Sequence, residues 1–501
     1  MTLHFSWGLR RRASDIRLSP ILLVTGPRAT GRCSHIYIWL RSFDRGAEFE
    51  RCKTMATRRF GLIVLLSSIS LVFLAATTAH AEPLSVESLP ETTGPEPQQD
   101  PAIAEAVELF KQRDFDGARQ AFEKAAKENS DLPPAEIMMA QLFSQINQGA
   151  AVRRSLEQAV ANSPKDPEAY VIMGEIAVGQ GRITEAALLL NEAASLLEGF
   201  DRSESRKKIL QIRTQAGLAA VAQARDDWKE AEKHLGAWLK LDPENVTALQ
   251  RMARAKFQNK QAAEALKLLR QAAEGNEDVL TPEIQLARFY QEYGDKKNAR
   301  IWIEQGLKAA PKDIPTRLVA AQWYLENGQI QEAAEQADAA LRIDPKSREA
   351  LIFRGVVGLF QKNYEQAAQF FQQAHLQSPR DFQASNNLAL ALVEQDDPLK
   401  KRRALEYAQA NVQQNQQSAD ALTTYGWVQF KLGNIDEAEK ALRMAGSAGP
   451  LRPDTAYYMA EVANAKGRTE EAVSLLEAAL RADAPFINRE EAQELLKKLK
   501  S

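Results

Sequence analysis

The sequence predicts an all-α fold, a right-handed superhelical solenoid of about eleven helix hairpins with a C-terminal capping helix. Alanines return every 34 residues through most of the 501-residue chain, and two further series keep the same period. The first series comprises Ala118, Ala186, Ala231, Ala265, Ala299, Ala333, Ala367, Ala404, Ala438 and Ala472. The others are Ala272, Ala340, Ala374, Ala445 and Ala479, and Pro243, Pro311, Pro345, Pro379 and Pro450. Three series with one period indicate a repeat array of α-helices.

The N-terminal residues differ from the repeats in composition. Residues 60–79 carry no charge, follow Arg58-Arg59 and precede Ala79-His80-Ala81, which is typical of a secretory signal peptide. We therefore interpret residues 55–81 as a signal peptide cleaved after Ala81. Residues 1–54 are then a mis-assigned extension before the true start at Met55.

An uncleaved signal segment would have a different consequence, because twenty apolar residues are long enough to span a bilayer. The alternative is therefore a chain anchored in the inner membrane by residues 60–79. Residues 82–101 hold five prolines and no basic residue, so they predict an acidic, disordered linker. The expected location is the periplasm or cell envelope, with membrane contact only if the signal segment is retained.

One repeat unit can be interpreted from the stretch Gly181–Ala194. The glycine permits a turn after a first helix, and Ala186 then allows a second helix to approach closely. A larger side chain at such a contact would overpack it, at a cost of about 1–3 kcal/mol. Leu190 follows one turn later and fills the space between the helices. In other units a proline ends the second helix.

The register places eleven units in residues 99–486. Residues 99–200 hold three units, of which the first two are degenerate, with Ser130 and Val152 in place of proline and alanine. Residues 201–211 are an insertion, which we expect to lengthen a second helix, and residues 212–486 hold eight units. Residues 487–501 form a polar helix that can cap the last apolar face.

The repeat resembles the tetratricopeptide repeat family, whose signature places small, aromatic and proline residues at fixed positions. In residues 167–200 the matching side chains are Tyr170, Met173, Gly174, Gly181, Ala186, Leu190 and Ala193. In residues 419–452 they are Tyr425, Gly426, Gly433, Ala438, Leu442, Ala445 and Pro450. The resemblance implies a solenoid that binds protein partners.

Nothing in residues 82–501 predicts catalysis. This part of the chain has no cysteine, and its two histidines, His234 and His375, share no spacing. The pairs Asp226-Asp227 and Asp396-Asp397 stand at expected turns, where carboxylates cap helices. We expect no enzyme, no cofactor, no metal site and no small-molecule substrate. After residues 1–81 are removed, 52 basic and 62 acidic residues remain, which excludes a basic surface for nucleic acid.

Family members bind partners in a concave groove lined by positions 2, 5, 9 and 12 of the first helices. The resemblance therefore implies a partner-binding groove formed by Gln250, Arg254, Phe257, Arg288, Gln322, Asn386, Trp427, Phe430 and Tyr457. Arg254 and Arg288 are one repeat apart and can hold a carboxylate or peptide carbonyls. Each can equally pair with a neighbouring glutamate. Trp427 and Phe430 can anchor an apolar side chain or simply pack between repeats.

The predicted function is a non-enzymatic protein–protein interaction scaffold of the bacterial cell envelope. One alternative is an assembly factor of an envelope polysaccharide-export or secretion complex, because the sequence around Asn386–Ala389 and Thr424–Trp427 loosely resembles such proteins. A second is a self-associating structural envelope protein, since a homo-oligomer is compatible with the sequence.

Overall fold

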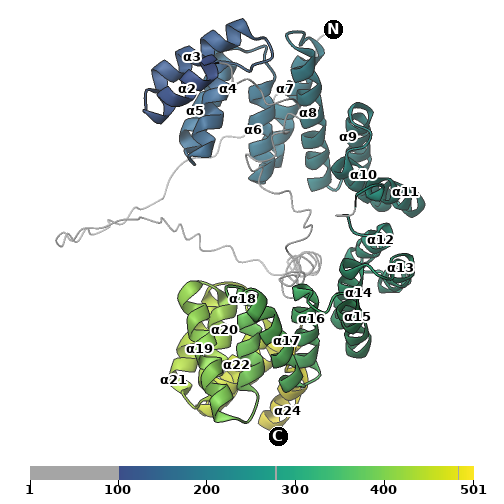
Figure 1. Ribbon diagram of the computed structural model, residues 1–501, viewed down its shortest axis with the longest axis vertical. Coiled ribbons are helices and arrows are strands. Elements are labelled where there is room, and N and C mark those ends of the chain that lie inside the picture. Colours follow the sequence, from purple (N-terminus) through teal and green to yellow (C-terminus); the bar gives the residue numbers. More distant parts are fainter. Residues whose placement is uncertain (1–100, 277–278, 483–484) are drawn as a thin grey trace, which may run out of the picture. The chain divides into compact units, whose positions relative to one another are not determined.

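The computed structural model describes residues 101–276, 279–482 and 485–501, and all of its described secondary structure is helical (Figure 1). Within these described ranges, twenty-two helices pair into eleven hairpins, and one helix follows them. The first helices are α2 (Pro101–Lys111), α4 (Ala135–Gln145), α6 (Glu168–Gly179), α8 (Glu204–Ala224), α10 (Val246–Gln258), α12 (Pro282–Glu292), α14 (Ile314–Glu326), α16 (Arg348–Phe360), α18 (Phe382–Val393), α20 (Ala419–Lys431) and α22 (Pro453–Ala465). The second helices are α3 (Phe115–Glu128), α5 (Gly149–Asn162), α7 (Ile183–Glu198), α9 (Trp228–Leu241), α11 (Ala262–Ala273), α13 (Lys296–Ala309), α15 (Ile330–Ile343), α17 (Tyr364–Gln377), α19 (Pro398–Gln414), α21 (Ile435–Ser447) and α23 (Thr469–Leu480), with α24 (Arg489–Lys500) last. The predicted all-α fold of helix hairpins is confirmed.

The period-34 alanines lie where two helices come closest. Ala186, Ala333 and every other alanine of that series are fully buried. Small residues are also needed on the first helices that face α7. Leu190 of α7 lies between two such residues, both of them glycines. A Cβ on Gly174 of α6 would lie 2.6 Å from Leu190 Cγ, and one on Gly217 of α8 would lie 2.8 Å from Leu190 Cδ1. Both neighbouring first helices therefore approach α7 too closely for a side chain.

The turn inside most hairpins requires a left-handed backbone residue. Glycine takes this place at Gly181, Gly294, Gly328, Gly433 and Gly467, with φ between 70° and 85°. Elsewhere a larger residue takes it, namely Arg113, Asn147, Asp226, Lys260 or Lys362, with φ between 56° and 67°. Positive φ disfavours a side chain, so these five positions keep a residue that the local backbone does not prefer.

The period-34 prolines mark the ends of second helices. Helices α9, α13, α15 and α17 each end two residues before their proline, as at Leu241 before Pro243. A proline restricts the residue before it to extended conformations and lacks the N–H that a helix needs. The expectation that these prolines stop the second helices is confirmed.

The insertion at residues 201–211 lengthens a first helix, so the expectation of a longer second helix is wrong. Helix α7 ends at Glu198, and residues 204–211 of the insertion form the first turns of α8, a 21-residue helix. Ser203 caps it by accepting a hydrogen bond from the Arg206 N–H. Phe200 is buried and ends the preceding unit. A side-chain cap at Ser203 favours a helix start there over continuation of α7.

The C-terminal helix α24 packs on α23, as expected for a cap. Ala492 is fully buried, and Leu495, Leu496 and Leu499 pack on the core of the last units. The predicted extension 1–54, the predicted signal peptide 55–81 and most of the predicted linker 82–101 lie outside the described residues. No helix within the described part of the chain has the length and apolar character to cross a membrane.

Candidate functional site

Arg254, at a predicted groove position of α10, forms an ion pair with Glu292 of α12. Arg254 Nη2 lies 2.5 Å from Glu292 Oε2, and its guanidinium lies 5.9 Å from the ring centre of Phe289. Both charged side chains are about one-third exposed. The glutamate pairing that the sequence left open for Arg254 is therefore present, and it links two successive repeats.

Arg288, one repeat later, lies beside a polar cluster built on Glu326. Gln322 Nε2 donates to Glu326 Oε1 at 2.9 Å, and Gln291 Nε2 donates to Oε2 at 2.6 Å. Burial raises the pKa of Glu326, while the two hydrogen bonds and the positive charge of Arg288 oppose that rise. Arg288 itself is half-buried, and its side chain makes no hydrogen bond to any described residue. It therefore keeps hydrogen-bond donors for a ligand.

Phe257 and Gln250 complete the α10 face. Phe257 is buried among aromatic rings, with centroids 4.8 Å from Tyr290 and 5.5 Å from Phe289. Gln250 is half-buried, and its side chain makes no hydrogen bond within the described part of the chain. The α10–α14 face thus combines arginine, glutamine and glutamate side chains above an apolar layer.

The predicted groove positions of α20 face an aromatic stack. The rings of Trp427 and Tyr458 are stacked with centroids 4.1 Å apart, and Phe430 stacks on Trp427 at 5.3 Å. Trp427 Nε1 donates to Glu394 Oε1 at 2.6 Å, and Lys431 Nζ lies 2.9 Å from Oε2 of the same carboxylate. Only 4% of Trp427 is exposed. The sequence allowed Trp427 and Phe430 either to anchor a partner or to pack between repeats, and these contacts are packing between repeats.

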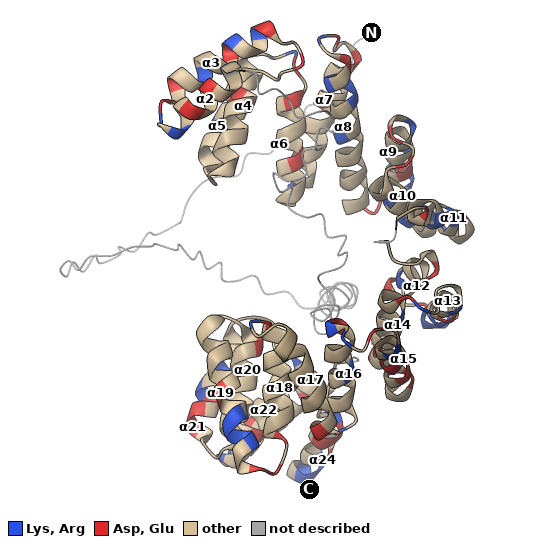
Figure 2. Ribbon diagram, in the orientation of Figure 1, with Lys and Arg blue, Asp and Glu red and all other residues tan. Residues whose placement is uncertain are grey.

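Tyr457 and Asn386 are also buried in these units. Tyr457 lies near Trp427 and donates its hydroxyl to Glu461 Oε1 at 2.8 Å. Asn386 lies in α18, which contains no charged residue, and Figure 2 shows that the ribbon of this helix is uncharged throughout. The structure brings Trp427, Phe430 and Tyr457 together. Sequence reasoning missed their partners Glu394 and Tyr458, because neither stands at a groove position.

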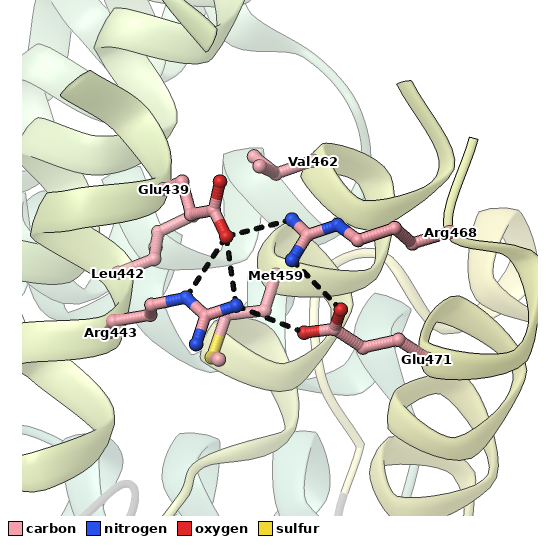
Figure 3. Close-up of a pocket in the computed structure, with 7 residues that line it drawn as sticks. All are labelled: Glu439, Leu442, Arg443, Met459, Val462, Arg468 and Glu471. Atoms are coloured by element: carbon pink, nitrogen blue, oxygen red, sulfur yellow. Dashed lines mark hydrogen bonds and ion pairs between the residues drawn. The ribbon is translucent and has the colours of Figure 1, made fainter. Parts of the chain in front are cut away.

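A second, outer group of charges lies on α21, on α23 and in the turn between α22 and α23 (Figure 3). Glu439 receives Lys466 Nζ at 2.5 Å and the guanidinium groups of Arg468 and Arg443 at 2.8 Å. Arg443 and Arg468 also reach Glu471, at 3.5 and 2.9 Å. Every cation here already has a carboxylate partner, so the group ties two repeats together and offers little to a ligand.

The histidines and acidic pairs have structural roles. His234 hydrogen-bonds to Gln215 at 2.7 Å, and burial lowers its pKa. His375 packs edge-on against Tyr407. Asp227 caps α9 and Asp397 caps α19 by accepting backbone N–H groups. Among the described residues no three metal-ligating side chains gather at one place.

Comparison with known families gives one consistent match. Models of the tetratricopeptide repeat match residues 137–199, 222–288, 318–379 and 423–485. These segments together make up about half of the chain.

Individual relatives are more distant. Over 146 residues the chain is 30% identical to cellulose synthase operon protein C of Pseudomonas fluorescens. The match covers 26% of this chain and 11% of that protein. A tetratricopeptide repeat protein of Parabacteroides merdae is 16% identical with a TM-score of 0.40, over 58% of this chain and 99% of that one. Pseudomonas aeruginosa PilF is 18% identical with a TM-score of 0.32, over 44% of this chain and 95% of that one.

Proposed function

This chain belongs to the tetratricopeptide repeat family, and we propose that it is a non-enzymatic scaffold that binds a protein partner on the face of α10, α12 and α14. Members of this family generally mediate protein–protein interactions. The proposed ligand is an extended peptide segment with a carboxylate or exposed main-chain carbonyl groups. Arg288 would bind that group, and the glutamines beside it would donate to or accept from the peptide main chain.

The proposal rests on one observation, that the half-buried side chain of Arg288 has no hydrogen-bond acceptor among the described residues. Its guanidinium is half-buried beside Glu326, yet the hydrogen bonds to that carboxylate come from Gln291 and Gln322. A partly desolvated arginine with free donors binds a planar acceptor strongly, because water competes less. Arg254 differs because Glu292 already neutralises it. The proposal therefore assigns the main role to Arg288.

We place this scaffold in the bacterial cell envelope, exported by the signal peptide predicted in residues 55–81. The match to cellulose synthase operon protein C favours the second candidate, an assembly factor of an envelope polysaccharide-export or secretion complex. This chain spans about one-tenth of that protein's length, so the match supports the repeat and not a shared activity.

Crosslinking capture from an envelope fraction tests the proposal. The bait is the full chain, as wild type and as Arg288→Ala. The matched control is Arg300→Ala, because Arg300 is an exposed arginine of the second helix α13 that pairs with Glu304 of the same helix. We expect one partner to be captured by wild type and by Arg300→Ala, and to be lost with Arg288→Ala.

Charge reversal at the same position sharpens the test. Arg288→Glu should reduce capture more than Arg288→Ala, because a carboxylate at this position repels the acidic group or carbonyl oxygens of the peptide. Equal capture by all variants would contradict binding at the α10–α14 face. Capture by none would leave the scaffold without the proposed partner and contradict the function itself.

A further inference from the structure

Helix α19 begins one turn earlier than the other second helices, measured from the buried alanine of the 34-residue series. In the other described hairpins that carry this alanine, the second helix begins three residues before it, as at Tyr364 before Ala367. Helix α19 begins at Pro398, six residues before Ala404. Three further residues lengthen a helix by about 4.5 Å. The first turn of α19 therefore extends past the starts of the neighbouring second helices.

This added turn opens a run of positive charge. Lys400–Arg403 are four consecutive basic residues in the first two turns of α19. Eight of the eleven described second helices have an acidic residue in their first turn, such as Glu365 in α17, whereas α19 has none. Cations near a helix N-terminus are unfavourable because the helix dipole is positive there. A local conflict of this kind is typical of a functional position.

Most of this charge is not neutralised. Arg402 and Arg403 are exposed, and neither side chain has a hydrogen bond or an ion pair among the described residues. Lys400 donates to a glutamine side chain, and Lys401 lies 3.3 Å from the fully exposed Asp396. From Asp396 to Arg403 the chain has four basic and two acidic residues, a net charge of +2. The turn is thus a basic surface on a chain that is acidic over residues 82–501.

An exposed leucine stands in the same turn. Leu399 is 71% exposed, the highest value among the large apolar residues that the structure describes. Single exposed leucines are common on protein surfaces. Here, however, the leucine lies on a protruding turn and is followed directly by the four cations. Apolar residues beside Lys and Arg are typical of protein surfaces that bind the boundary between lipid headgroups and acyl chains.

We propose that residues 398–403, which we call the basic turn, bind the surface of a bilayer that contains anionic phospholipids. Arg402 and Arg403 contact the headgroup phosphates, and Leu399 enters the apolar layer below them. A protruding turn can present all these side chains to a flat surface at once. The sequence tied membrane contact to retention of residues 60–79, whereas this contact does not use that segment. The inference is independent of the α10–α14 face, because the two surfaces share no residue.

Vesicle co-sedimentation tests the charges. The protein is residues 82–501, the predicted mature chain, because the apolar segment 60–79 would itself enter lipid. Wild type should bind vesicles of phosphatidylcholine and phosphatidylglycerol in equal amounts about tenfold more tightly than vesicles of phosphatidylcholine alone. Arg402→Ala/Arg403→Ala should lose about tenfold in affinity for the mixed vesicles.

The matched control is Arg153→Ala/Arg154→Ala. These are two consecutive exposed arginines of the second helix α5, so the control removes the same net charge at another place. It should bind the mixed vesicles as wild type does. Equal binding of wild type to both kinds of vesicle would overturn the proposal. An equal loss in the two double variants would do so as well, because net charge and not the basic turn would then govern binding.

A second pair of variants tests the apolar contact. Leu399 and Leu376 are 71% and 70% exposed, and Leu376 lies near the end of α17. Leu399→Ser should weaken binding to the mixed vesicles about threefold or more, because a buried leucine side chain is lost, and Leu376→Ser should not. A labelled polyglutamate peptide should bind wild type more weakly than the vesicles do. Polyglutamate binding as tight as vesicle binding, with no loss in Leu399→Ser, would assign the basic turn to an acidic protein and overturn the bilayer as its partner.

Discussion

Arg206 reaches back 40 residues to Asp166, with Nη2 at 3.1 and 3.0 Å from the two carboxylate oxygens. The same nitrogen lies 2.6 Å from Glu168 Oε2. Side chains of Arg206 and Asp166 are each 7% exposed. Arg206 belongs to the insertion, so these bonds tie the lengthened α8 to the turn before α6. The insertion is a structural brace across the third unit.

Removing this arginine should be costly. Arg206→Ala leaves the buried Asp166 without its cation and leaves Glu168 with Arg213 alone, 3.9 Å away. We expect a loss of about 3–5 kcal/mol in the free energy of unfolding. Arg153→Ala is the control, because Arg153 and Glu157 form an exposed pair on one helix, where we expect a change below about 0.5 kcal/mol. Urea denaturation followed by circular dichroism measures both. Similar midpoints for the two variants would contradict the brace.

Two glycines of α6 should respond in opposite directions to alanine. A Cβ at Gly174 would lie 2.6 Å from Leu190 Cγ, whereas one at Gly179 meets nothing within 4 Å. We expect Gly174→Ala to destabilise the chain by about 1–3 kcal/mol through overpacking. Gly179→Ala should stabilise it by up to about 1 kcal/mol, because alanine favours a helix. Thermal melting of both variants checks this, and a stabilised Gly174→Ala would contradict the close contact of α6 with α7.

Acid should weaken the outer ion-pair group. The hydrogen bond from Lys466, helped by those from Arg468 and Arg443, lowers the pKa of Glu439 to about 2, against an ordinary value of 4.5. A depressed pKa in the folded chain stabilises it above pH 4.5, and this stabilisation is lost as the pH falls from 4.5 to 2. The effect is on the order of 1 kcal/mol, since the group lies at the surface.

Glu439→Gln tests this pH dependence directly. Its free energy of unfolding should fall less than that of wild type between pH 4.5 and pH 2. A matched Glu437→Gln variant changes an acidic residue of the same helix for which no ion pair is found among the described residues, and it should behave as wild type. Parallel curves for wild type and Glu439→Gln would refute the assignment.

The sequence predicted those parts of the fold that repeat. Ala186 and Leu190 have equivalents in most units, so a single period indicated the hairpins and their close contacts. The sequence did not indicate which groove positions stay accessible. Arg254 and Trp427 hold the same place in their units, yet the arginine side chain is 38% exposed and Trp427 only 4%.

That difference arises from contacts distant in sequence. Tyr458 covers Trp427 from the next first helix, and the segment 486–488 returns to the same interior. Neither follows the 34-residue period, so no register can predict them. Arg206 was missed for the same reason, because its partners lie in a different unit from the insertion that carries it.

We therefore expect Trp427→Ala to lower the free energy of unfolding even when no partner is present. Removing a buried indole that stacks on Tyr458 and Phe430 should cost about 3–5 kcal/mol in the free energy of unfolding. Trp427→Phe keeps an aromatic ring but loses the hydrogen bond to Glu394, which retains Lys431, so about 1 kcal/mol is expected. Urea denaturation of both variants without any partner separates the two roles of this residue. If Trp427→Ala were as stable as wild type and lost only a captured partner, Trp427 would be an anchor for that partner and the buried stack would not hold the last units together.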